Sequence, residues 1–239
     1  MKTIEQRYEE VYVPLLKEFG RQIKGVKVSG IPEPHLPAYG KDYDKTKHKI
    51  VFVGIETKGW GDMKDFPKIL DRKVEEILRD NISQLDVPLR PGSFWNFIRK
   101  VLAKIHQVDP SAIDKLKDFA WANANSIERF SVTAKERAAI GDWTKVKAAS
   151  LVFDSAKHVV DVLKPDLMII LWWSPDATWL TKGLSAATCR KKYDHHMWHY
   201  EVTSGPQVIW TAHPRWLSAN GFERYVIKVS NLARKLLEM

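Results

Sequence analysis

Four short apolar runs, each separated from the next by a longer amphipathic segment, most constrain how this chain can fold. They are Ile50–Val53, Phe119–Asn123, Leu167–Trp173 and Val208–Ala212. Runs of this length, bounded by turn residues, are typical of buried strands. Strands that alternate with helices favour parallel βαβ units. We therefore expect an α/β fold with three α/β/α layers around a central, mainly four-stranded parallel sheet.

Five segments around these runs carry apolar residues at helical spacing. They are residues 3–23, 67–81, 93–105, 144–163 and 218 onward. Thr3 and Gln6 fit a capping box for the first helix, and Pro14 is expected to kink or split it. Ser93 is a good N-cap for the third helix, and Pro165 is expected to end the fourth.

The rest of the chain is assigned to loops of one domain. Residues 29–47 contain three alternating prolines and are expected to form a loop. Residues 186–203 are expected to be a hairpin or an irregular insertion before the last core strand. No repeat or linker divides the sequence, so we expect a single domain over residues 1–239, with residues 1–48 as an N-terminal extension.

The composition favours a polyanionic partner. In 239 residues, 38 Lys and Arg against 29 Asp and Glu give a net charge of +9, and there are 10 Trp, 9 Phe and 7 Tyr. Basic residues beside aromatic ones suit nucleic-acid binding, although core packing and solubility account for the same counts. The single cysteine, Cys189, excludes an internal disulfide and a four-cysteine metal or iron–sulfur site.

The chain is expected to be soluble and cytoplasmic. Its longest apolar run has seven residues, far short of the roughly 20 that span a bilayer. The N-terminal segment also lacks the apolar stretch of a signal peptide.

Chemically distinctive residues follow three of the four expected strands. Glu56 comes just after the first, Asn123 and Asn125 end the second, and His213 follows the fourth. Ligands of open parallel sheets bind at the carboxyl ends of the strands. An amide offers a donor and an acceptor to a base edge, and a histidine can donate to a developing anion. An ordinary turn, a helix cap or a surface side chain is the alternative for each residue.

In chain order, these segments resemble the uracil-DNA glycosylase superfamily. Residues 54–57 (G-I-E-T) are similar to its Gly-x-Asp/Asn-Pro segment, and residues 122–123 (A-N) to a strand end with a base-reading residue. Residues 169–173 (I-I-L-W-W) are similar to its V-x-x-L-W-G strand. Residues 213–218 (H-P-R-W-L-S) match four of six positions of its His-Pro-Ser-Pro-Leu-Ser loop. The resemblance covers roughly residues 48–235.

Four departures bear on the base that is removed. Glu56 replaces the family's Asp or Asn, Thr57 its Pro, and Arg215 and Trp216 its Ser and Pro. The pattern therefore supports membership of the superfamily more strongly than it supports uracil as the base that is removed. A bulky modified base is an alternative substrate, as for superfamily members that attack modified viral DNA. The single cysteine excludes the branches that carry an iron–sulfur cluster.

The resemblance implies a monofunctional DNA glycosylase. Such an enzyme hydrolyses the N-glycosidic bond of a flipped-out uracil or other modified base and leaves an abasic site. It implies two catalytic residues: Glu56 would stabilise the cation-like sugar or orient water, and His213 would hydrogen-bond the leaving base. Asn123 would read the base edge, with Asn125 as a second candidate.

The remaining candidates would contact the base or the DNA backbone. The further base-binding candidates are Phe94, Trp95 and Trp60. Leu217 matches the family's intercalating residue, and Trp216 beside it would widen the wedge. Basic candidates for phosphate contacts are Arg215, Lys58, Lys182, Arg190, Lys191 and Lys192, with a solvated face as the alternative. We expect no cofactor, no membrane and no obligate protein partner, and a monomer that binds DNA, duplex or single-stranded.

A histidine-rich segment supplies one of two alternative functions. Asp194, His195, His196 and His199 are dense in metal-ligand types. The set lacks the glutamate of H-E-x-x-H, so a polar loop that lines the cleft is favoured and no metal is assigned. A metal-dependent hydrolase is nevertheless an alternative, and chelator sensitivity would identify it. The second alternative is a nucleic-acid-binding module that has kept the fold and lost catalysis, in which case no abasic sites would form.

Overall fold

The structure is a computed structural model of the whole chain. It describes residues 2–26, 34–55, 76, 91–115, 118–126, 143–173, 178–184 and 187–238. Three candidate residues, Glu56, Lys58 and Trp60, lie outside the described residues. So does the expected helix over residues 67–81, apart from Glu76, which is helical. None of the described helices is long and apolar enough to cross a membrane.

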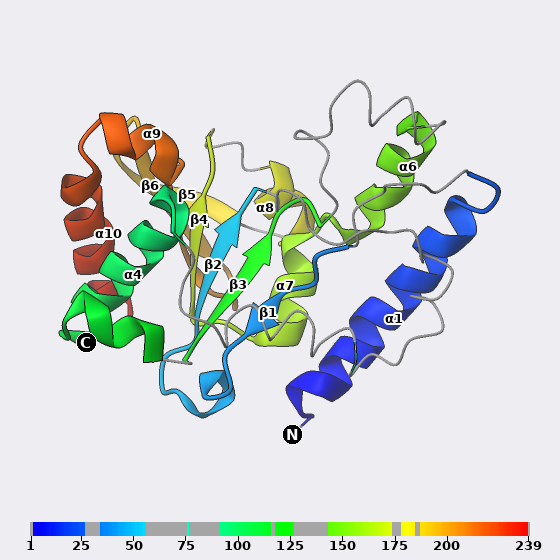
Figure 1. Cartoon of the computed structure of the whole chain (residues 1–239), viewed down its shortest axis with the longest axis horizontal. Coiled ribbons are helices and arrows are strands. Elements are labelled where there is room, and N and C mark those ends of the chain that lie inside the picture. Colours follow the sequence, from blue (N-terminus) through cyan, green and yellow to red (C-terminus); the bar gives the residue numbers. More distant parts are fainter. Residues whose placement is uncertain are drawn as a thin grey trace.

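A mixed sheet of seven strands forms the centre of the described part, in the order β1-β3-β2-β4-β7-β6-β5 (Figure 1). The strands are β1 (Ala38–Tyr39), β2 (Ile50–Gly54), β3 (Phe119–Asn123), β4 (Leu167–Leu171), β5 (Ala187–Asp194), β6 (Met197–Val202) and β7 (Gln207–Thr211). Strands β3, β2, β4 and β7 are parallel, which confirms the expected four-stranded parallel centre. β1, β6 and β5 extend it with antiparallel pairs.

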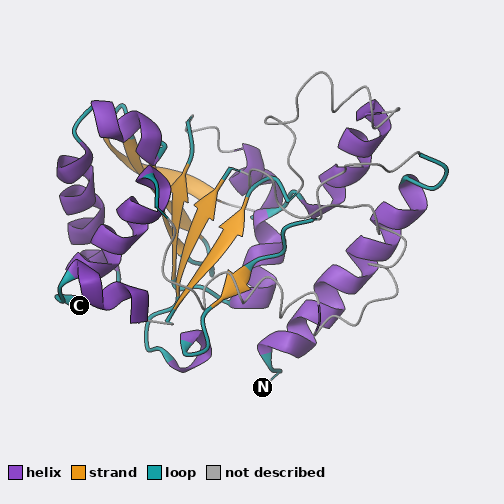
Figure 2. Ribbon diagram, viewed as in Figure 1, coloured by secondary structure: helices purple, strands orange, loops and turns teal. Residues whose placement is uncertain are grey.

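Helices flank this sheet on both faces (Figure 2). One face carries α4 (Ser93–His106), α9 (Pro214–Ala219) and α10 (Phe222–Leu236); the other carries α1 (Ile4–Gln22), α6 (Trp143–Ser150), α7 (Ala156–Leu163) and α8 (Thr178–Gly183). Successive side chains of a strand point to opposite faces of the sheet, so each strand contributes side chains to both cores. In β2, Val51 and Val53 pack with α1 and α7, whereas Ile50 and Phe52 pack with α4 and α10. Short 3-10 turns cover Tyr43–Lys45, Pro110–Lys115 and Leu151–Phe153.

Two helix predictions are wrong in their extent. The expected helix over residues 144–163 is broken into α6, a 3-10 turn and α7, because Ser155 starts α7 as a new N-cap by accepting the Lys157 N–H. The last helix begins at Pro214 rather than near residue 218. It is then interrupted at Gly221, whose φ of 100° favours glycine.

The N-terminal extension packs along the sheet. α1 keeps its predicted capping box and runs through Pro14 as one helix. Its buried side chains Tyr8, Tyr12 and Phe19 pack in the core beside α7. β1 lies within the expected loop 29–47, where no strand was predicted, and it pairs with β3. The hairpin alternative for residues 186–203 is confirmed by β5 and β6.

Candidate functional site at the carboxyl edge of the sheet

The four parallel strands end at one edge of the sheet, which we call the carboxyl edge. β2 and β4 are neighbours in the sheet. From β2 the chain continues to β3 on one side of this pair, and from β4 it continues toward β7 on the other side. A reversal of this kind opens a crevice above the strand ends, where α/β proteins bind ligands. Gly54 pairs with Asn123 in the register of β2 and β3, and Leu171 pairs with Thr211 in β4 and β7. The expected candidate residues follow these strand ends.

Asn123 is a buried amide at this edge. Its side chain is 6% exposed, and its Nδ2 has no hydrogen-bond partner among the described residues. A buried donor without a partner costs about 1–3 kcal/mol, so it needs a functional or structural reason. Gly54 makes room for it: a Cβ at Gly54 would lie 2.6 Å from the Asn123 Oδ1 and 3.3 Å from the Phe94 ring. The end of β2 therefore accommodates the amide and the aromatic ring together.

We expect Gly54→Ala to lower the free energy of unfolding by about 1–3 kcal/mol, because the new methyl group overpacks this corner. Chemical denaturation of the variant measures the loss. In the Asn123→Ala background the same substitution should cost less, since its nearest contact is then gone. Equal costs in both backgrounds would contradict the assignment of the clash to Asn123.

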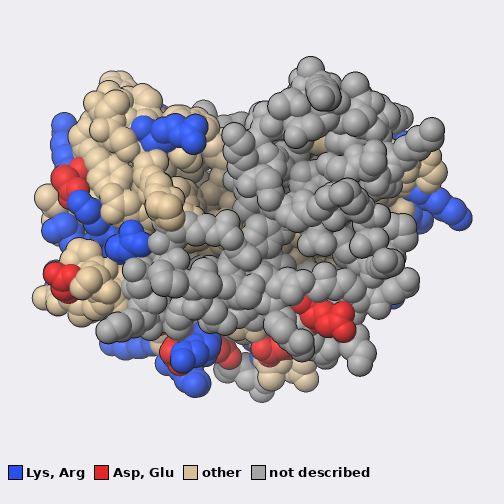
Figure 3. All heavy atoms as spheres, in the orientation of Figure 1, with Lys and Arg blue, Asp and Glu red and all other residues tan. Residues whose placement is uncertain are grey.

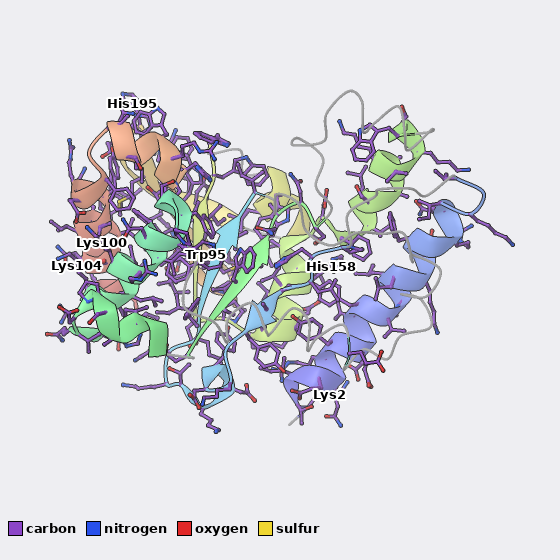
Figure 4. The ribbon with its side chains drawn as sticks, viewed as in Figure 1. Lys2, Trp95, Lys100, Lys104, His158 and His195 are labelled. Carbon is purple, nitrogen blue, oxygen red and sulfur yellow. The ribbon has the colours of Figure 1, made fainter. Side chains whose placement is uncertain are left out.

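Aromatic side chains form one wall beside this amide. Phe94 and Trp95 are half-buried in the first turn of α4, and Trp121 is buried on β3. The ring centroids lie 5.1 Å apart for Phe94 and Trp95, and 4.8 Å apart for Trp95 and Trp121. Figure 4 labels Trp95 among the side chains between α4 and the sheet. Of the expected base-binding aromatics, the structure brings Phe94 and Trp95 to the carboxyl edge.

His213 stands at the same edge, two residues after β7. Its ring is nearly parallel to that of Trp173, with centroids 4.4 Å apart, and to that of Phe94 at 6.4 Å. Its Nδ1 accepts the Arg215 backbone N–H at 3.2 Å, which caps α9. Burial, with a smaller contribution from the Arg215 charge, lowers the pKa of His213 to about 4. At neutral pH the ring is therefore uncharged, with Nδ1 as the acceptor and the proton on Nε2.

His35 is a buried histidine near the carboxyl edge that the sequence analysis did not consider. It is 1% exposed, its backbone N–H donates to the Ser126 carbonyl at 2.6 Å, and its ring lies 4.3 Å from that of Trp121. Asn125 is 6% exposed, as Asn123 is. It lies in the same turn as Ser126 and donates its backbone N–H to the Ile55 carbonyl. The only sequence signal was a histidine between prolines, because the pairing of β1 with β3 is not visible in the pattern.

The burial of His35 has a consequence for stability. Burial lowers the pKa of His35 from 6.5 to about 3. As the pH falls below 6.5, the unfolded chain takes up this proton and the folded chain does not. We expect the free energy of unfolding to fall by about 2 kcal/mol from this group between pH 7 and pH 5, at ~1.4 kcal/mol per unit. Denaturation at both pH values should show a smaller fall for His35→Phe, and an equal fall would contradict this origin.

Leu217 is not placed as a wedge. It is fully buried and packs in the core with α4 and α10, so its match to the family's intercalating residue stays a prediction. Because α9 begins at Pro214, Leu217 lies on the inner face of that helix, and its N–H donates to the His213 carbonyl. Trp216 is half-buried, and its ring lies 4.0 Å from that of His196.

Basic candidate residues lie on the hairpin and on α9. In the register of the sheet, Lys191 is level with Ile209 in the middle of β7, and Arg190 pairs with Glu201, so of these candidates only Arg215 follows a strand end. Arg190 and Lys191 of β5 are exposed, as is Arg215. Met197 pairs with Thr211, so the turn of the hairpin lies at this edge. Figure 3 shows Lys and Arg side chains over α4, α9 and α10 in the orientation of Figure 1. The side chain of Lys182 lies outside the described part.

The histidine-rich segment is held by contacts within the protein. The His199 Nε2 lies 2.7 Å from the Gln207 Oε1. Asp194 accepts from the Lys228 Nζ at 2.6 Å and from the His196 N–H at 2.8 Å. In the described ranges, no group of three or more metal-ligand side chains lies close enough to hold an ion. These residues instead anchor the hairpin turn, near the labelled His195, on α9 and α10 (Figure 4).

A cavity of about 570 Å³ lies at the opposite edge of the sheet. It is lined by Lys2, Arg7, Glu10, Val11, Asp44, Lys49, Asp161 and Lys164. Its four cationic and three anionic side chains largely offset one another, as in the pairs of Lys2 with Glu10 at 2.6 Å and of Lys49 with Asp44 at 3.0 Å. The carboxyl edge gathers the buried amide, the neutral imidazole and the aromatic wall, and is the stronger candidate.

No known protein-family model and no curated protein sequence matches this chain. The functional argument therefore depends on the geometry of the carboxyl edge and on the resemblance of its segments.

Proposed function

We propose that this protein is a DNA glycosylase that hydrolyses the N-glycosidic bond of uracil or another modified base. The observation that carries the proposal is the arrangement at the carboxyl edge. There, the buried Asn123 amide, the Phe94 ring and the neutral His213 imidazole come from three separate elements. The four-stranded parallel centre and the chain order of these segments agree with the resemblance to the uracil-DNA glycosylase superfamily.

Asn123 recognises the base through hydrogen bonds. Its Nδ2 donates to a ring carbonyl, and its Oδ1 accepts from a neighbouring ring N–H. A base with that carbonyl and N–H side by side therefore gives the Nδ2 donor the partner that it lacks among the described residues. Phe94, whose ring lies against Gly54, offers a face for stacking.

His213 supplies stabilisation of the leaving group. When the bond between the sugar C1′ and the base nitrogen breaks, its electron pair moves onto the base and the sugar becomes cation-like. The Nε2–H of the neutral ring donates to the base oxygen on which negative charge develops. Water then adds to C1′ and loses a proton. Glu56 lies outside the described residues, and its role is the one that the resemblance implies: it would stabilise the cation-like sugar or orient this water.

The test is abasic-site formation on DNA that contains uracil, hypoxanthine, thymine mismatches or heavily modified viral bases. We expect alkali-labile breaks on at least one of these substrates, and the substrate that breaks names the base class. Binding without breaks on every substrate would overturn the proposal and favour the non-catalytic binding module. Loss of activity on chelation would instead favour a metal-dependent hydrolase.

A further inference from the structure

The cavity at the opposite edge of the sheet takes no part in the proposed function. Its volume of about 570 Å³ lies in the range of small-molecule sites, roughly 300–1,000 Å³. The start of α1, the turn before β2 and the end of α7 line it, and they supply Lys2, Lys49 and Lys164. Figure 4 labels Lys2 at the start of α1. Three segments that are far apart in the sequence therefore bring cations to one cavity.

The lining of this cavity carries one positive charge in excess, since its cationic side chains number four and its carboxylates three. The carboxylates of Glu10 and Asp44 are paired with lysines of the same lining, at 2.6 Å and 3.0 Å. The third carboxylate, Asp161, accepts a hydrogen bond from Lys157, a residue outside the lining. The three carboxylates are therefore already engaged with lysines.

Arg7 is a fixed cation in the wall of the cavity. Its side chain is 11% exposed, and its Nε donates to the Val162 carbonyl at 2.6 Å, while its Nη1 donates to the Lys2 carbonyl. Its Nη2 is buried, has no hydrogen-bond partner in the described ranges, and lies 3.9 Å from the Asp44 Oδ1. A buried guanidinium nitrogen without an acceptor favours an anion beside it.

Lys164 is a second cation of the lining that has no close carboxylate. Its Nζ lies 3.9 Å from the Asp161 Oδ1, which is beyond hydrogen-bond distance. It is the C-cap of α7, and its φ of 47° is in the left-handed region that glycine or asparagine adopts at lower cost. The backbone therefore does not favour a lysine here, whereas an ammonium group on the cavity gives a reason for one.

We propose that this cavity binds a small anion of the phosphate class, as the free ion or as a phosphate monoester. Its oxygens accept from the Lys164 ammonium group and lie beside the Arg7 guanidinium, the two kinds of cation that bind phosphate in proteins. The remaining volume accommodates an organic group next to Val11, the apolar side chain of the lining. This site needs no base excision and does not depend on the proposed function.

Isothermal titration calorimetry of the whole protein with inorganic phosphate and with ribose 5-phosphate tests the proposal. We expect saturable binding of at least one of them, weakened by added chloride because the contacts are ionic. Tighter binding of ribose 5-phosphate would identify a monoester as the ligand, and tighter binding of phosphate the free ion. The absence of binding by either probe at about 10 mM, where a ~1 mM affinity would be visible, would overturn the proposal.

Lys164→Gly and Lys164→Asn each remove the ammonium group and keep a residue that adopts the left-handed region. Both should weaken the binding by about 10- to 150-fold, which is the loss of one charge-assisted hydrogen bond. The thermal midpoint without ligand should stay equal or rise, since the strained lysine is gone. Lys24→Asn, just after the far end of α1, is the matched control and should leave the affinity unchanged. Unchanged affinity in both Lys164 variants would overturn the proposal, because Lys164 would then serve only the end of α7.

Asp44→Asn tests the charge argument with the opposite sign. It removes an exposed carboxylate that competes with the anion for Arg7 and Lys49. We expect binding to become about 2- to 5-fold tighter, the range that corresponds to one exposed ion pair. Unchanged or weaker binding would contradict the assignment of the excess positive charge to the ligand.

The calorimetry also separates this cavity from the candidate site at the carboxyl edge. Phosphate binding that is weakened in Lys164→Gly and kept in His213→Ala would place the anion in the cavity, whether or not abasic sites form. Binding that is weakened in His213→Ala and kept in Lys164→Gly would place the anion at the carboxyl edge and overturn the inference, with the proposed function unaffected.

Discussion

His213→Ala is expected to lower the single-turnover rate of abasic-site formation by about 10²–10³-fold, the usual cost of removing one donor from a developing anion. The structure gives the physical reason. The ring is uncharged at neutral pH, its Nδ1 is occupied by the Arg215 N–H, and its proton is on Nε2. The measurement is alkali cleavage of the excised DNA under conditions of excess enzyme.

His48→Ala is the matched control for this experiment. His48 lies just before β2, at the opposite edge of the sheet, and its loss should leave the rate unchanged. An active His213→Ala protein would remove the histidine from the mechanism and with it the role of α9 in the site. A protein that has lost its fold would be recognised by its circular dichroism spectrum.

Asn123→Ala is expected to lower kcat/KM for excision by about 5- to 150-fold, since a hydrogen-bonded pair at a buried amide contributes ~1–3 kcal/mol. The thermal midpoint should stay equal or rise, because the variant removes a buried donor that has no partner among the described residues. This combination of lower activity and undiminished stability is the signature of a residue kept for its ligand. The two measurements are steady-state excision and a thermal melt.

Asn125→Ala separates the two amide candidates. Asn125 is equally buried, two residues further along the chain. A large loss of activity in Asn125→Ala, with a small one in Asn123→Ala, would transfer the base-reading role to Asn125. A fall in the thermal midpoint of Asn123→Ala would instead indicate a structural amide.

The sequence was sufficient for the parallel centre of the sheet because those strands are buried on both faces and carry continuous apolar runs. Phe119–Asn123 was predicted with its observed bounds. β1 was missed because a two-residue strand has no periodicity of its own and is defined by its pairing with β3. The break before α7 was missed because apolar periodicity continues across it, and only the capping by Ser155 marks it.

The site shows the same division. The chain order of strand ends was enough to bring Asn123 and His213 to one edge, as parallel strands require. The orientation of Leu217 depended on where α9 begins, and Pro214 at the first helical position was the signal that could have placed it. His35 comes to the carboxyl edge through the pairing of β1 with β3. The two strands are about 80 residues apart in the chain, since Ala38 pairs with Trp121.

The position of β2 in the sheet also governs when the carboxyl edge is assembled. Ile50 pairs with Phe119 on one side and with Leu167 on the other, so the central strand waits for partners that are 69 and 117 residues further along the chain. Contacts of such long range slow folding, since loop closure precedes their stabilisation. During synthesis, the amide of β3 is made long before the histidine that follows β7. The carboxyl edge therefore holds both groups only once the chain has been made as far as His213.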